Sequence, residues 1–98
     1  MKYLWFYEVN LGLLEKWLKI QPKYAEEVRK EEKYGKRIAQ YVYESFKGVS
    51  IIEFDNYKQL YNRIVLSTPY ITVKPVPCIE GPLAREVRGE INKLKETW

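Results

Sequence analysis

The chain has 98 residues, of which 46% are hydrophobic and 31% charged, and its formal net charge is +4. This length suits one domain, this balance is typical of a globular chain rather than a disordered one, and no apolar run approaches the roughly 18 residues of a membrane span. With no histidine and a single cysteine, Cys78, the sequence excludes an intramolecular disulfide and disfavours zinc, haem and histidine-activated nucleophiles.

These features predict a cytoplasmic protein with no membrane segment, no metal site and no cofactor. The basic residues alternate with acidic ones around Val28, as on a solvated helix face, and do not form a stripe for phosphates. The abundance of Lys, Glu and Tyr beside few Gln and Cys is typical of a heat-adapted source.

The first predicted element is a strand over residues 1–9, which is dense in aromatic and apolar residues. Asn10 can cap the helix that follows, where apolar residues recur at helical spacing. Pro22 interrupts that run, so we expect either a kink just before it or two successive helices. Gly35 is the expected end of this helical region.

Two strands are predicted next, over residues 37–46 and 49–55, and Lys47-Gly48 joins them at the length of a tight hairpin turn. In that register Glu44 lies opposite Ile51. Because side chains alternate along a strand, each face of the hairpin then carries its own set of residues. One face holds Ala39, Tyr41, Tyr43, Ile52 and Phe54, and the other holds Gln40, Val42, Glu44, Phe46, Val49, Ile51 and Glu53.

Asn56 has the spacing of a capping box and begins a short predicted helix that ends at residues 67–69. A fourth strand is predicted over residues 70–76. Proline cannot donate to a sheet ladder, so Pro75 and Pro77 indicate an edge strand or a strand end. A last helix begins at Pro82, and its apolar residues lie on one side. These residues are Leu83, Val87, Ile91 and Leu94.

The order of elements is βαββαβ with an added helix, which predicts an α+β, ferredoxin-like fold. We expect a four-stranded antiparallel sheet with two helices on one face and an extra C-terminal helix. The whole chain, residues 1–98, is predicted to form a single domain, with a core over residues 1–80 and a helical extension over residues 82–96.

The second face of such a sheet is left open, and in this chain it is predicted to be strongly apolar. A large apolar face in contact with water favours burial against a partner, and two copies can bury both faces with closed two-fold symmetry. We therefore expect a homodimer. The predicted interface residues are Tyr3, Trp5, Tyr7, Val42, Phe46, Val49 and Ile51.

The stretch KGVSIIEF, residues 47–54, resembles the signature strand of RNA-recognition domains, which also have this topology. In that family two aromatic residues on the open face stack on bases. Val49 and Ile51 stand at those positions here and have no π-face, whereas outward Trp5 and Tyr7 would favour RNA. Nucleic-acid binding through the sheet face is therefore kept as an alternative, and recognition of another protein is a third.

The aromatic first strand, the GVSIIEFDN segment and the closing VKPV resemble the dimeric α/β-barrel superfamily over residues 1–80, and within it a small branch. That superfamily includes cofactor-free monooxygenases and muconolactone isomerase-like proteins. The resemblance implies a homodimer and a cavity between sheet and helices, or inside the barrel, that binds or converts a small molecule.

Candidate chemistry in such a cavity falls to Glu44 and Glu53, which are predicted to project into it from neighbouring strands, with Tyr43 and Arg37 nearby. Burial would raise a carboxyl pKa toward the range of a general base. Against this, glutamates on a sheet face commonly pair with Lys or Arg at its rim, and tyrosines commonly pack. The sequence leaves open whether the protein is an enzyme.

Overall fold

The computed structural model describes residues 1–98. Its elements in chain order are strand β1 (Lys2–Val9), 3-10 helix η1 (Leu11–Leu13), helices α1 (Leu14–Val28) and α2 (Glu31–Tyr34), strands β2 (Lys36–Glu44) and β3 (Lys47–Glu53), helix α3 (Tyr57–Ser67), strand β4 (Ile71–Pro77) and helix α4 (Gly81–Lys95). The strands form one antiparallel sheet in the order β2-β3-β1-β4. The protein therefore has an α+β architecture, and this order is compatible with a ferredoxin-like fold.

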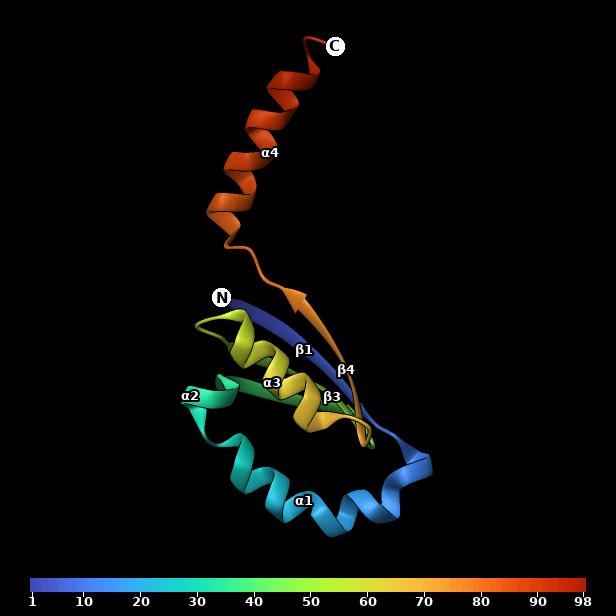
Figure 1. The fold of residues 1–98 in the computed structure, drawn as a ribbon. Coiled ribbons are helices and arrows are strands. Elements are labelled where there is room, and N and C mark those ends of the chain that lie inside the picture. The colour runs from blue at the N-terminus through green and yellow to red at the C-terminus, as the bar shows by residue number, and fades with distance from the viewer.

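Helices α1, α2 and α3 lie on one side of the sheet, and α4 extends away from it (Figure 1). The main core lies between the sheet and α3. Trp5 of β1 is 3% exposed, and Ile52 and Phe54 are completely buried. Leu60 and Ile64 of α3 pack against this cluster, so the helix-covered face of the sheet is the buried one.

The prediction that Tyr3, Trp5 and Tyr7 lie on the open face of the sheet is wrong. Tyr3 and Trp5 belong to the buried cluster, Tyr7 packs against it, and Tyr3 lies directly opposite Ile52. Because side chains alternate along a strand, all three share the face that the helices cover. Both faces of β1 are rich in apolar residues, so alternation by itself did not identify the buried one.

The turn between β2 and β3 also differs from its predicted position. It is formed by residues 45–46, the second of which has a φ of 66°, and Lys47 already belongs to β3. Ile51 consequently pairs with Ala39 rather than with Glu44, a shift of 44 − 39 = 5 residues. This odd shift moves the side chains of residues 39–42 to the other face of the sheet. A second irregularity between Val42 and Glu44 leaves Glu44 on the face of Val49 and Ile51, as predicted.

Gly48 explains why the expected turn failed. A Cβ atom at this position would collide with the ring of Tyr7 and with the carbonyl oxygen of Tyr41. The glycine is thus required by close packing inside the sheet, where the backbone must pass directly against a neighbouring ring. In the sequence it has the same signature as a turn glycine.

The open face keeps an apolar group of residues, which differ from those predicted, beside charged residues such as Lys47 and Lys74. The alternation of β1 brings Leu4 and Phe6 to this face, opposite Ile51 and Val49 of β3. The large apolar residues of this face are Leu4, Phe6, Tyr41, Val49, Ile51 and Val76. We call these six residues the open-face patch.

The predicted helix cap and the predicted edge strand are confirmed. Asn10 caps the helical segment by accepting from the backbone N–H of Gly12, and β4, which carries Pro75 and Pro77, is an edge strand.

Pro22 lies inside one continuous helix, α1, so the alternative of two successive helices is wrong. No helix has the length and apolar character needed to cross a membrane.

Helix α4 stands apart from the rest of the molecule (Figure 1). None of its residues is buried. The radius of gyration is 17.2 Å, whereas a compact chain of this length has a radius of about 13 Å. The projecting helix accounts for this difference.

Candidate functional site

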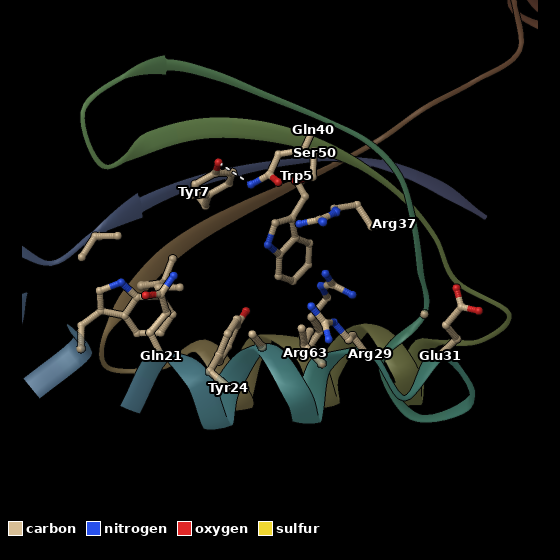
Figure 2. A pocket seen from close by; sticks show the side chains of 16 residues that line it. Trp5, Tyr7, Gln21, Tyr24, Arg29, Glu31, Arg37, Gln40, Ser50 and Arg63 are labelled. Carbon is tan, nitrogen blue, oxygen red and sulfur yellow. Dashed lines mark hydrogen bonds between the residues drawn. The ribbon is translucent and has the colours of Figure 1, made fainter. Parts of the chain in front are cut away.

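A cavity of about 670 Å³ lies between the sheet and α1, and half of its sixteen lining residues are hydrophobic. Trp5 and Tyr7 of β1 form its roof, and α1 contributes Trp17 and Tyr24 (Figure 2). The site is therefore a partly open cavity, lined by aromatic residues, of the size that commonly binds small molecules.

Three contacts hold α1 across the sheet while leaving this space. Near the start of the helix, Trp17 is buried against Val9 of β1 and Ile71 of β4. Further along, the Tyr24 hydroxyl lies 3.1 Å from Oγ of Ser67 in α3. At its end, Glu27 Oε2 accepts a 2.6 Å hydrogen bond from the Tyr34 hydroxyl.

Arg63 of α3 is the most unusual residue of the cavity. It is only 6% exposed, and its guanidinium lies 5.8 Å from the centre of the Trp5 ring. Nη1 donates to the Tyr34 carbonyl oxygen at 3.0 Å, but Nε is buried without a hydrogen-bond partner. Burial lowers the pKa of Arg63, and the neighbouring charge of Arg37 lowers it further, whereas Tyr24 acts in the opposite direction.

Two more arginines converge on the same point. Arg37 enters from β2 and Arg29 from the C-terminal end of α1, and Figure 2 shows both side chains directed toward Arg63. Glu31 is the only acidic lining residue, and it lies at the margin of the cavity, away from the three guanidinium groups. No arginine takes part in any ion pair of the structure, so the positive charge of the cavity is not neutralised.

The roof of the cavity supplies neutral polar groups. Gln40 Nε2 donates to the Tyr7 hydroxyl at 2.8 Å, and both residues line the space. Ser50 is buried beside them. Polar atoms of a ligand can form hydrogen bonds next to these groups, while the aromatic side chains that line the cavity can contact an apolar part of the ligand.

Of the four residues predicted to carry chemistry, only Arg37 lines the cavity. Glu44 is exposed at the end of the hairpin and pairs with Lys47 at 3.4 Å. Glu53 lies at the opposite end of β3, where it binds the terminal amino group of Met1 at 2.8 Å. The expectation that Glu44 and Glu53 project together into one cavity is wrong, and Tyr43 is exposed on β2.

The remaining predicted interface residues are dispersed. Val42 pairs with Gly48 and shares the helix-facing side of the sheet, although it is exposed there. Phe46 lies in the hairpin turn. Val49 and Ile51 do lie on the open face, as part of the open-face patch.

The residue that sequence reasoning missed is Arg63. Tyr57 and Tyr61 of α3 are exposed, whereas the buried residues of this helix are Gln59, Arg63 and Ser67. A signal was present, because these three polar residues recur every four positions. Polar residues at this spacing normally indicate the solvent-exposed side of a helix, so the pattern did not identify Arg63 as a residue of the site.

Comparisons with protein-family models, with curated proteins and with solved structures found no significant match to this chain.

Proposed function

We propose that this protein binds a small organic anion in the cavity between the sheet and α1. The observation that carries the proposal is the buried guanidinium of Arg63, which has no counter-ion and has a free Nε. A buried charge is costly unless it is paired and hydrogen-bonded. An anionic group placed between Arg63 and Arg37 would supply both the missing charge and the missing acceptor.

The residues that line the cavity indicate which class of ligand it binds. A volume of about 670 Å³ falls within the range of small-molecule sites and leaves room beyond one acid group. Arginine forks match the planar oxygens of a carboxylate or a phosphate. Trp5 and Tyr24 offer ring faces, so the body of the ligand is expected to be apolar or aromatic.

Binding, rather than conversion, is the activity that these residues support. The cavity has no cysteine or histidine, and its one carboxylate, Glu31, is at the margin. A general base with a pKa near neutrality is therefore missing around the arginines. The role proposed is that of a sensor, carrier or binding domain for the anion.

RNA binding through the sheet is not favoured. The aromatic residues that supported it, Trp5 and Tyr7, lie on the covered face and line the cavity. On the open face, Val49 and Ile51 stand where bases would stack, and neither side chain has a π-face.

We also propose that the fold is the ferredoxin-like arrangement and that a second copy covers the open-face patch, as in the dimeric α/β-barrel superfamily that the sequence resembles. The support is the apolar character of the patch, with Leu4, Phe6 and Ile51 side by side on two paired strands. Light scattering is expected to give twice the chain mass of 11.8 kDa.

The binding proposal is tested by titrating the full chain with benzoate and with phenyl phosphate, followed by calorimetry. At least one probe is expected to bind, and Arg63→Gln is expected to weaken binding roughly 10-fold or more, because hydrogen bonds to charged groups contribute about 1.5–3 kcal/mol. Arg37→Gln removes a cation that is less buried, so it tests the same site without disturbing the core.

Arg85→Gln is the matched control, because Arg85 lies on the exposed helix α4 and the change in net charge is the same. It is expected to leave binding unchanged. Failure of both probes at millimolar concentration, or equal losses in Arg85→Gln and Arg37→Gln, would contradict the proposal.

A further inference from the structure

Helix α4 has an apolar seam with the spacing of a coiled coil. Ala84, Val87, Ile91 and Leu94 follow one another at intervals of three, four and three residues, and Trp98 comes four residues later. Alternating intervals of three and four keep such residues on one side of a helix and are the a and d positions of a heptad repeat. Val87 is 47% and Ile91 44% exposed, so nothing in the chain covers the seam.

A short helix with an exposed apolar side, such as α4, is stable only when that side packs against a partner. α4 has 15 residues and includes Gly89, and isolated helices shorter than about 12–15 residues are marginal in water. No ion pair of the chain includes a residue of α4, and the nearest one joins Lys2 to Glu80, just before the helix, at 4.0 Å. Packing of the seam is the available source of stability.

The charges beside the seam identify the partner. On one flank, in the e positions, lie Arg88 and Lys95; on the other, in a g position, lies Glu90. In a parallel pair of identical helices the g position of one faces the following e position of the other, so Glu90 meets Lys95 of the second copy, twice by symmetry. In an antiparallel pair e faces e, and Arg88 would meet Lys95 with the same charge.

We propose that α4 pairs in parallel with α4 of a second copy of this chain through the seam of Ala84, Val87, Ile91 and Leu94. Gly89 takes the outermost f position of this pair, where a side chain contributes no packing, and nothing lies within 4 Å of the place its Cβ would occupy. The pairing is independent of the anion cavity, because α4 extends away from the sheet beyond β4, far from α1, which lines the cavity (Figure 1).

Sedimentation equilibrium of the full chain tests the pairing. The wild-type chain is expected to form a dimer, and Ile91→Asp is expected to raise the dissociation constant by roughly 100-fold, since it places a charge in a dry seam. Glu90→Lys is expected to raise it about 10-fold, and Glu90→Lys combined with Lys95→Glu to restore it, because the reversed pair is again attractive. Glu96→Lys, on the outer side of the helix, is the matched control for charge.

Orientation is tested separately by Leu94→Cys in a Cys78→Ser background. In a parallel pair the two new thiols face each other and are expected to form a disulfide-linked dimer on oxidation. Three results would overturn the proposal: a monomer at 100 micromolar or so in wild type, a dissociation constant that Ile91→Asp leaves unchanged, or equal effects of Glu90→Lys and Glu96→Lys. A dimer that keeps its affinity in Ile91→Asp would instead assign the contact to the open-face patch.

Discussion

Glu27 is the residue that joins α1 to α2. Its carboxylate accepts from Lys30 Nζ at 2.8 Å, from the Tyr34 hydroxyl at 2.6 Å and from Lys33 Nζ at 3.4 Å. The hydrogen bond from Lys30, followed by that from Tyr34, lowers the pKa of Glu27 from 4.5 to about 2. Through Tyr34 this cluster also fixes the carbonyl group that holds Arg63.

Glu27→Gln is expected to reduce the acid sensitivity of the fold. The carboxyl pKa is lower in the folded chain, so the stability that Glu27 contributes is present above pH 4.5 or so and is lost as the pH falls toward 2. Thermal unfolding midpoints measured across this window should fall less in Glu27→Gln than in the wild-type chain. Glu26→Gln, which changes an exposed carboxylate without an ion pair, should follow the wild type; identical slopes in all three chains would contradict the expectation.

At the scale of single residues, the sequence predicted one of the groups that make the cavity. Arg37 was a candidate because its side chain could take part in proton chemistry in the predicted cavity, whereas Arg63 lies within a helix among residues that alternate in character. Its burial depends on which way α3 rotates, and that is decided by Leu60 and Ile64 packing against Phe54 and Trp5. Such a choice between two faces of one helix is made by tertiary contacts, not by local spacing.

Among the elements, α1 is notable because it continues through Pro22. A proline inside a helix lacks the N–H that would bind the carbonyl of Leu18, and its ring presses on that carbonyl. The helix persists because Trp17 holds it on one side of the proline and Tyr24 and Glu27 hold it on the other. The anchors that bound the cavity therefore also offset an unfavourable residue.

Pro22→Ala is expected to stabilise the chain by about 1–3 kcal/mol, since it restores a helical hydrogen bond at an exposed position. Urea unfolding of the two chains measures this difference. Lys23→Ala, an exposed neighbour in the same turn, should change stability by only a few tenths of a kcal/mol. A Pro22→Ala chain that is no more stable than Lys23→Ala would show that the backbone around residue 22 is already relaxed.

The elements themselves were largely predicted, and the pairing between them was not. Every strand and helix lies near its predicted residues, because periodicity and capping are local properties. The hairpin register depended on one assumption, that Gly48 marks a turn. Its actual role is to pass beside Tyr7, and this contact between distant strands left no local signature.

For the whole molecule, the division into a core and a projecting helix has a direct consequence for stability. Both buried clusters consist of residues between Tyr3 and Val73, and no residue of α4 is buried. The core thus contains its complete set of packing contacts. The order of its elements was predicted from the sequence, but the separation of α4 from the sheet was not, since an amphipathic helix has the same pattern whether it packs on its own chain or on another.

A chain that ends at Glu80 is expected to fold and to unfold cooperatively at nearly the midpoint of the full-length variant Ile91→Asp, in which the seam of α4 is disrupted. Small-angle scattering at concentrations low enough to give the monomer should yield a radius of gyration of about 12 Å, the value for a compact chain of that length. Loss of cooperative unfolding would mean that α4 stabilises the core by contacts other than those present here.

The two edges of the sheet are chemically different. In β4 the backbone N–H of Cys78 donates to the carbonyl oxygen of Lys2 in β1. Because the direction of the N–H groups alternates along a strand, the backbone nitrogens of the odd-numbered residues of β4 point away from the sheet. Two of these residues, Pro75 and Pro77, have no hydrogen to donate. The β2 edge keeps its donors. Open-ended growth of a fibre requires two edges that can pair head to tail. Pro75 and Pro77 remove two of the four outward donors of β4 and leave those of Ile71 and Val73. A strand added along this edge would therefore keep part of its carbonyl groups without a donor, which disfavours growth of a fibre through β4.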